Sequence, residues 1–251
     1  MRHPFNLRRE QYLDARQIVG NPSDDPALIR LAREYNAHMG LPPLRETPYF
    51  RLNQNLEAAV AEAYNEADSC PACDLEREAW GCLVAECDAQ FELLVRDGLH
   101  VEYYGTPGEH KEDESPYADS TDMIEDVRRN FHLWVWEGGH PAPLLSQEAN
   151  TRFRAVHDVF GHAAHGLSFG WRGEVNAWSQ HWKMFTPLAR VALTTETRAQ
   201  VDWVFAGPYA PEAERGDFHF PEQKAAVLAP RFQIVPALAR AYSDWPQFLE
   251  L

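Results

Sequence analysis

Apolar residues in the first hundred positions recur every three or four residues, which is the spacing of one face of an α-helix. A first helix is predicted to begin at the cap Asp25-Pro26 and to end at Gly40, with an apolar face formed by Leu28, Ile29, Leu31, Ala32 and Tyr35. Thr47-Pro48 has the same form as Asp25-Pro26, so a second helix is expected over residues 49–67. A third is expected over residues 75–96. The chain up to residue 115 is therefore predicted to be a helical N-terminal part.

Two short segments alternate between apolar and polar residues, as strands do. They cover residues 99–104 and 131–136. A polar loop with turn residues occupies positions 105–116 between them. A helix then begins at a cap formed by Asp119 or Ser120 and runs to Arg129.

The remaining helices surround the part of the chain that is rich in histidine. One begins at Ser146, after the break Gly138-Gly139-His140-Pro141-Ala142-Pro143. A helical pattern over residues 172–205 is interrupted at Thr186-Pro187. The sequence thus predicts a single, mainly α globular domain over residues 1–251 with a few short strands, in which residues 116–251 form the metal-binding catalytic core.

Charge and hydropathy narrow the classes of partner. The chain has 38 acidic and 23 basic residues and a formal charge of -15, which opposes binding to the phosphates of duplex nucleic acid. No apolar run approaches the roughly 20 residues that span a bilayer. The first ten residues lack the apolar stretch of a secretory signal. We therefore expect a cytoplasmic protein that binds neither duplex nucleic acid nor membranes.

Four cysteines lie close together at Cys70, Cys73, Cys82 and Cys87. Two pairs of thiolates at such spacings could hold a structural zinc ion. The alternative is four reduced thiols in helices. Helix-like sequence around the cysteines and the scarcity of glycine favour reduced thiols.

Histidines are concentrated in one segment of the chain. Five of the eleven fall between positions 140 and 181, namely His140, His157, His162, His165 and His181. An even distribution would place about two there. His157 and His162 flank an acid, two apolar residues and a glycine, which indicates a site for one metal ion.

The spacing of His157 and His162 requires a distorted helix. Residues five apart in a regular α-helix point about 140° away from each other. A π-helical widening to about 4.4 residues per turn reduces this angle to roughly 50°, and such bulges are common at functional sites. Gly161 makes that distortion easier. The alternative is that both histidines are structural and lie on different faces of the helix.

The segment His157-Asp158-Val159-Phe160-Gly161-His162 resembles the His-Glu-Leu-Leu-Gly-His segment of the pterin-dependent aromatic amino acid hydroxylases, with aspartate in place of glutamate. The predicted strand at 131–136 precedes it, as an aromatic strand does in that family. Asn176-Ala177-Trp178-Ser179-Gln180 follows it and is similar to the family's Phe-Ala-Gln-Phe-Ser-Gln. The similarity covers about residues 130–205.

The resemblance implies a hydroxylase-like catalytic core in which two histidines and a glutamate hold one Fe(II), with a reduced pterin as second cofactor. His157 and His162 match the two histidines. Glu196, which lies 34 residues after His162, is the best match for the glutamate, and Glu174 is the alternative. Such a ligand set leaves exchangeable positions on the iron for dioxygen and substrate.

Three further residues are candidates for catalytic roles beside the metal. Asp158 is expected to orient a histidine or a bound water. His165 is a candidate hydrogen-bond donor, or a third imidazole ligand in a zinc enzyme, and His181 is expected to line the pocket. Residues 136–141 lack the arginine with which the family binds its substrate carboxylate, and the family's pterin-binding loop has no match here. The substrate is therefore described only as a small molecule.

The sequence leaves three functions open. The first is a mononuclear non-haem iron(II) oxygenase, that is, a hydroxylase-like monooxygenase. The alternative is a zinc-dependent hydrolase that uses the same histidines, with Asp158 or Glu174 as general base, although the H-E-x-x-H spacing is absent. The third is a helical binding module.

The apolar tail Trp245-Pro246-Gln247-Phe248-Leu249 is expected to pack on the core or on a second subunit of a homo-oligomer.

Overall fold

The first predicted helix shows how local sequence sets the ends of an element. In the computed structural model, which describes residues 22–109 and 115–250, α2 (Pro26–Met39) begins where the Asp25 carboxylate accepts hydrogen bonds from the backbone N–H groups of Ala27 and Leu28. It ends at Gly40, whose φ of 66° is a left-handed conformation that glycine adopts easily. Both predicted ends are confirmed.

The chain is mainly helical, as predicted, with one small sheet. The other α-helices are α3 (Gln54–Glu66), α4 (Asp74–Arg96), α5 (Ser120–Asn130), α6 (Gln147–His157), α7 (Trp171–His181), α8 (Pro187–Thr194), α9 (Gln200–Ala206), α10 (Ala210–Ala213), α11 (Pro236–Ala241) and α12 (Pro246–Leu249). Two π-helical segments are η1 (Asp158–Ala163) and η3 (Thr195–Ala199), and two 3₁₀ segments are η2 (Trp182–Met184) and η4 (Pro230–Phe232).

The predicted start of the second helix is wrong. α3 begins at Gln54, and Asn53 rather than Thr47 caps it. Phe50 lies outside the helix, and its backbone bonds to the side chain of Asn176 on α7: the Phe50 N–H donates to Asn176 Oδ1 at 2.9 Å, and the Phe50 carbonyl accepts from Asn176 Nδ2 at 3.0 Å. A contact distant in sequence thus overrides the local helix signal and ties this segment to α7.

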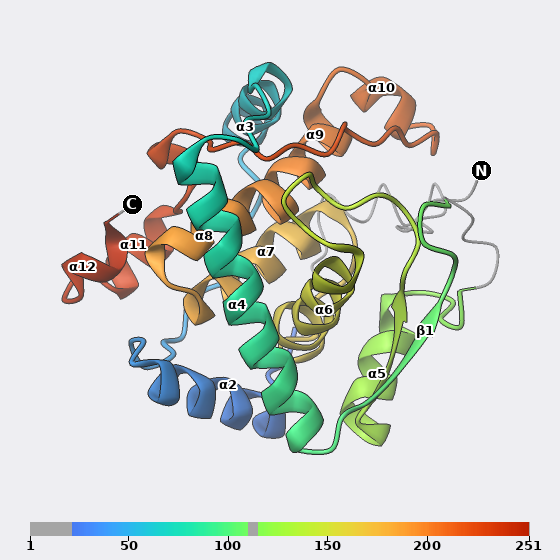
Figure 1. Ribbon diagram of the computed structural model, residues 1–251, viewed down its shortest axis with the longest axis vertical. Coiled ribbons are helices and arrows are strands. Elements are labelled where there is room, and N and C mark those ends of the chain that lie inside the picture. Colours follow the sequence, from blue (N-terminus) through green and yellow to red (C-terminus); the bar gives the residue numbers. More distant parts are fainter. Residues whose placement is uncertain (1–21, 110–114, 251) are drawn as a thin grey trace.

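The two predicted strands form a parallel pair. β1 (His100–Tyr104) lies beside β2 (His132–Trp136), with His100 opposite His132 and Tyr104 opposite Trp136. α5 connects the strands and packs on β2, as Figure 1 shows on the side of the molecule that carries β1. Part of the loop predicted at 105–116 lies outside the described residues.

The N-terminal helices pack on those from the second half of the chain. α4 lies in front of α8 in Figure 1, with α6 to its right, and it contacts both. α3 packs on α9. The main hydrophobic core includes residues from Leu28 to Phe248, and Leu167 and Ala177 form a small second cluster. Among residues 22–109 and 115–250, no helix combines the length and apolar character needed to cross a bilayer.

The C-terminal tail packs on the same chain. Phe248 is only 4% exposed and lies against the rings of Trp182 and Tyr242. Its carbonyl accepts a hydrogen bond from Arg190, whose guanidinium carbon is 3.5 Å from the centres of the Trp182 and Phe248 rings. Of the two roles that the sequence left open for this tail, the structure shows packing on the core.

Both interpretations of the four cysteines are wrong. Cys70 and Cys73 form a disulfide in the turn before α4, where the Cys73 N–H donates to the Cys70 carbonyl and the Cα atoms lie 5.4 Å apart. Cys82 and Cys87 are free thiols on α4, and Cys87 is buried in the core. The four sulfur atoms therefore do not form one zinc site, because the helix carries the second pair away from the turn.

A buried ion pair joins α3 to the segment η3. Arg198 is fully buried, and its Nη2 lies 2.7 Å from the Glu57 carboxylate while its Nε lies 3.4 Å from that of Asp202. Its guanidinium also donates to the Phe232 carbonyl. Because removal of one partner leaves buried charge without compensation, this pair fixes how α3 and η3 sit together.

We expect Arg198→Met to lower the free energy of unfolding by about 3–5 kcal/mol, since the buried Glu57 carboxylate would lose its cation. Urea denaturation followed by circular dichroism would measure the change. Arg129→Met, which removes an exposed arginine paired with Glu125 on α5, should stay near the wild-type value. Equal effects of the two substitutions would contradict the role given to the buried pair.

Candidate metal centre

A π-helical segment brings the two histidines of the motif together. α6 ends at His157 and continues directly into η1, which contains His162. The ring centres of His157 and His162 are 5.1 Å apart and their planes are nearly perpendicular. The predicted widening of the helix is confirmed, and it places both imidazoles on one side of the backbone.

Close packing against α7 explains the glycine in the motif. A Cβ atom at Gly161 would lie 3.1 Å from Cε1 and Nδ1 of His157 and 3.4 Å from Cβ of Ala177. Any larger side chain at this position would therefore push the His157 ring or separate η1 from α7.

The carboxylate beside the two histidines comes from the first turn of α7. Glu174 Oε2 is 3.2 Å from Nε2 of His162 and 3.8 Å from Nε2 of His157. One ligand atom from each of the three residues lies within 4.8 Å of the other two, and all three residues are buried. This arrangement offers two imidazole nitrogens and one carboxylate oxygen to a single ion.

Hydrogen bonds determine which nitrogen of His157 carries its proton. The Gln90 side-chain oxygen lies 2.7 Å from Nε2 of His181 and can only accept, so His181 donates from Nε2. Nδ1 of His181 must then accept, and its partner at 3.1 Å is Nδ1 of His157, which therefore donates. Nε2 of His157 is left without a proton when the ring is neutral, and its lone pair is available to a metal.

A backbone carbonyl places the proton of the second histidine on Nδ1 as well. Nδ1 of His162 donates to the Leu167 carbonyl at 3.0 Å, so Nε2 of the neutral ring also has a free lone pair. Among the described residues, Nε2 of His157 is buried and has no hydrogen-bond partner. Three electron-pair donors thus converge where a buried cation would satisfy all of them.

The electrostatics of the cluster favour an ionised glutamate. Burial alone would raise the pKa of Glu174, but the positive charge of a protonated His162 and its hydrogen bond to Glu174 outweigh it and lower the pKa to about 2. Burial would lower the pKa of His162, but Glu174 raises it. Burial lowers the pKa of His157. The cluster therefore keeps Glu174 as an anion, and a metal ion that binds there would replace the proton held between Glu174 and His162.

The structure does not place Glu196 in this cluster. Its carboxylate accepts hydrogen bonds from Nε1 of Trp80 at 3.0 Å and Nε2 of Gln200 at 3.2 Å. Burial raises the pKa of Glu196 to about 8. Of the two glutamates weighed as ligands from the sequence, Glu174 lies beside the histidines, and Glu196 lies on η3 against α4.

The other three candidate catalytic residues, His181, Asp158 and His165, differ in their contacts. His181 contacts His157 directly, as described above. Asp158 follows His157 in the chain, and burial raises its pKa to about 7 although the charges of His162 and Arg154 oppose this shift. His165 is bonded elsewhere: Nδ1 lies 2.8 Å from the Asp24 carboxylate.

Sequence reasoning missed Gln90, Trp80 and the Leu167 carbonyl. Gln90 and Trp80 lie on α4, more than sixty residues before the motif in the chain. Their contacts depend on how α4 crosses the later helices, and no local pattern reports that crossing. The Leu167 carbonyl is five residues after His162 and carries no signal because any residue type offers a carbonyl.

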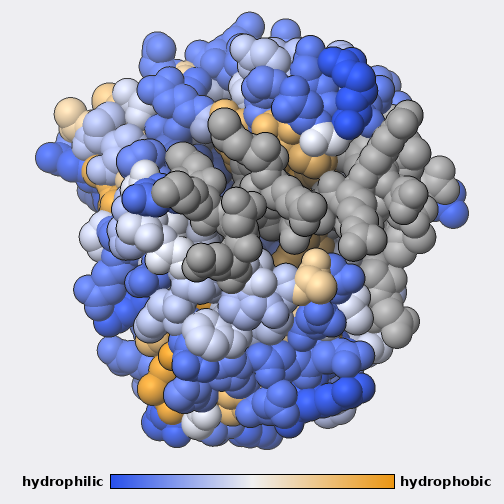
Figure 2. Space-filling view, turned by 90° about the vertical axis from the view of Figure 1, so that its right-hand side faces the viewer, coloured by the Kyte–Doolittle hydropathy of each residue, from blue (hydrophilic) through white to orange (hydrophobic). Residues whose placement is uncertain are grey.

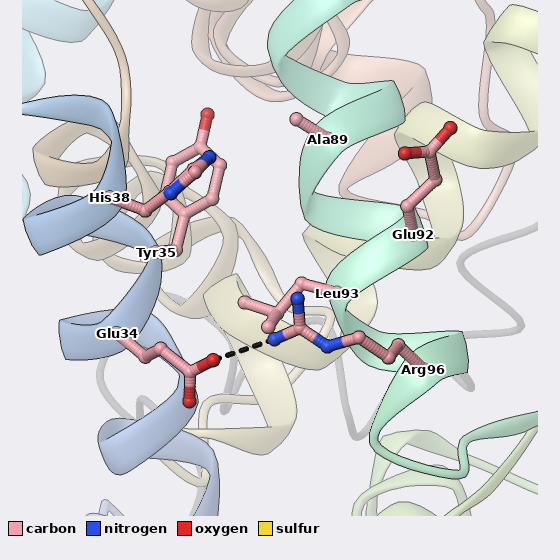
Figure 3. A pocket seen from close by; sticks show the side chains of 7 residues that line it. All are labelled: Glu34, Tyr35, His38, Ala89, Glu92, Leu93 and Arg96. Carbon is pink, nitrogen blue, oxygen red and sulfur yellow. Dashed lines mark hydrogen bonds and ion pairs between the residues drawn. The ribbon is translucent and has the colours of Figure 1, made fainter.

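A groove between α2 and α4 is separate from the metal cluster. Its volume is about 460 Å³, and an ion pair between Arg96 and Glu34 crosses it, as Figure 3 shows. Its other lining residues are Tyr35, His38, Ala89, Glu92 and Leu93. None of these residues belongs to the cluster of histidines and Glu174, so the groove is not part of that site.

We expect Gly161→Ala to weaken metal binding about tenfold, because the added methyl group displaces the His157 ring. Titration of metal-stripped protein with Co(II), followed by its visible absorption, would measure the affinity. Gly81→Ala on α4 is the matched control, since a Cβ there meets nothing within 4 Å. Unchanged affinity in Gly161→Ala would show that the close approach of Gly161 does not position His157.

The raised pKa of Glu196 predicts a pH-dependent stability. Between the usual carboxyl pKa of about 4.3 and the folded value of about 8, the native state holds a proton that the unfolded chain releases, so stability falls as the pH rises through this window. Glu196→Gln should remove that loss and become relatively more stable towards pH 9. Melting temperatures of wild type, Glu196→Gln and the surface control Glu125→Gln across pH 5–9 would test this, and parallel curves for all three would contradict it.

Comparison with known proteins adds no family to this description. The sequence matches no family model, no curated protein and no solved structure. The geometry of the site is therefore described by the residues of this chain alone.

Proposed function

We propose that the protein is a mononuclear non-haem iron(II) oxygenase in which His157, His162 and Glu174 hold the metal. The observation that carries this proposal is the buried Nε2 of His157, which has a free lone pair, no hydrogen-bond partner among the described residues, and a carboxylate oxygen 3.8 Å away. A buried polar atom without a partner is rare in folded proteins and calls for an explanation such as an ion.

The donor set fits iron. Two imidazoles and one carboxylate on one face are the ligands of non-haem Fe(II) oxygenases, and they leave the remaining positions exchangeable. Iron bound there would supply the activation of dioxygen for hydroxylation of a small-molecule substrate. The resemblance to the aromatic amino acid hydroxylases supports the same assignment of His157 and His162, with Glu174 in place of Glu196 as the carboxylate.

The protein residues around the cluster hold the ligands and exclude water. Phe153 stacks on the His157 ring, with centres 6.0 Å apart, and the edge contact of Phe169 with His162 has centres 4.8 Å apart. His181, itself buried, keeps the proton of His157 on Nδ1. These contacts fix the rings so that both Nε2 atoms face Glu174 before any metal arrives.

Asp158 is the group best suited to exchange a proton beside the site. Its pKa of about 7 means that the carboxyl is partly protonated at neutral pH. A group that can both hold and release a proton near the working pH is what acid–base steps need. We assign Asp158 this role, and Glu196, whose pKa is raised to about 8, remains largely protonated at neutral pH.

A zinc-dependent hydrolase is the second candidate function. Two histidines and a glutamate also hold catalytic zinc, and Asp158 would then act as general base on a metal-bound water. The ligand set is the same, so the identity of the metal and the need for oxygen separate the two functions.

Anaerobic loading with Fe(II) tests the ligands and the function together. We expect about one iron per chain in wild type, at least about tenfold weaker binding in His157→Ala, His162→Ala and Glu174→Gln, and wild-type binding in Glu196→Gln. Nitric oxide added to the loaded wild type should give the high-spin electron paramagnetic resonance signal of an iron site with an open position. Oxygen consumption would be followed with and without a tetrahydropterin, which is the electron donor that the family resemblance implies.

The possible outcomes separate the parts of the proposal. Loss of iron from Glu196→Gln but not from Glu174→Gln would move the carboxylate ligand to Glu196 and leave the iron site in place. Wild-type iron binding in both histidine variants would refute the site. A purified zinc protein that hydrolyses substrates without oxygen would favour the hydrolase.

A further inference from the structure

The two-stranded sheet carries a second cluster of metal-ligating side chains. His100 on β1 lies directly opposite His132 on β2, and their rings stack with centres 5.3 Å apart. Glu102 is two residues beyond His100, so its side chain is on the same face of the strand. The parallel register therefore brings His132 beside His100 and Glu102, which lie about thirty residues earlier in the chain.

The distances between the ligand atoms are close to those that a metal requires. Glu102 Oε2 lies 3.0 Å from Nε2 of His132 and 3.9 Å from Nε2 of His100. One ligand atom from each residue lies within 4.8 Å of the others. Ligands on a tetrahedral zinc ion, with bonds of about 2.0–2.1 Å, are about 3.3 Å apart. Since the His100 side chain is 67% exposed, a small rotation can close the remaining gap.

A hydrogen-bonded carboxylate behind the cluster orients His132. Asp126 Oδ2 lies 2.6 Å from Nδ1 of His132, and the same carboxylate accepts from the Tyr117 hydroxyl at 2.8 Å and from Asn130 Nδ2 at 2.7 Å. The His132 side chain is only 16% exposed. A carboxylate that holds Nδ1–H of a histidine leaves Nε2 for a metal, which is the arrangement found behind many zinc ligands. This support distinguishes the cluster from acids that merely lie near each other on a surface.

Charge and access also suit a cation. The ligand set and Asp126 together contribute two carboxylates and two imidazoles. The side of the molecule that carries β1 and α5 in Figure 1 is turned to the viewer in Figure 2, where its described surface is largely hydrophilic. The side chains of His100 and Glu102 are 67% and 45% exposed, so a hydrated ion can reach them from solvent.

We propose that His100, Glu102 and His132 form a second metal site, distinct from the cluster on η1 and α7, that binds a zinc-class divalent cation. Two imidazoles and a carboxylate suit ions of intermediate softness such as Zn²⁺. Three protein ligands leave the fourth tetrahedral position to water. The two clusters share no residue, so the second site does not depend on the proposed oxygenase function.

Calorimetric titration of metal-stripped, full-length protein with zinc chloride tests this site. We expect His100→Gln and Glu102→Gln each to bind one zinc ion fewer than wild type. Asp126→Asn should bind the same number with that site weakened about 10- to 100-fold, because the orientation of His132 is lost. His219→Gln is the matched control, since His219 is a partly exposed histidine with a single carboxylate 3.9 Å away, and it should bind zinc as wild type does.

The zinc titration can support or overturn the proposed second site. Loss of one zinc in the two ligand variants, with retention in His219→Gln, supports the site. The proposal is overturned if either ligand variant binds zinc as wild type does, or if His219→Gln shows the same loss. Because His100 and Glu102 are exposed, unfolding is not expected, and far-ultraviolet circular dichroism of each variant would verify this. His157→Ala should leave the second site intact, so failure here is distinguishable from failure of the iron site.

Discussion

The hydrogen-bonded series from Gln90 through His181 to His157 determines which atom of the candidate metal centre is free to bind an ion. Gln90 lies on α4, His181 at the end of α7 and His157 at the end of α6. Because the series has only one consistent direction of donation, the packing of three helices fixes the protonation of one imidazole. The chemistry at Nε2 of His157 therefore depends on helix packing as much as on the motif.

Much of the local structure could be predicted from the sequence, because it depends on signals within a few residues. The cap at Asp25, the glycine at position 40 and the π-helical bulge required by the spacing of His157 and His162 are of this kind. The start of α3 could not be predicted, since Asn176 holds Phe50 from 126 residues away. The cap signal at Thr47-Pro48 does not start a helix, because two hydrogen bonds that only the folded chain can make hold Phe50 outside it.

The choice between Glu174 and Glu196 as the carboxylate ligand could not be made from the sequence either. Glu174 and Glu196 both lie in helical segments after the motif, and the sequence does not report the rotation of either segment about its axis. Docking of α7 against η1, where Gly161 meets Ala177, places Glu174 beside the histidines. The cluster at His100 and His132 likewise depends on the register of β1 and β2. The alternation of residues predicts the two strands but not which residues lie opposite each other.

The bulge η1 has a consequence for how the chain tolerates changes in length. A π segment is equivalent to one extra residue accommodated within an α-helix. Deletion of a single residue between His157 and His162 would remove that extra residue and would allow a regular helix. The two histidines would then be four residues apart and would still share one face, but the residues between them would shift, and with them the close approach of Gly161 to Ala177 on α7. The bulge thus lets this chain keep histidines five residues apart on one side of the backbone together with the glycine that packs on α7.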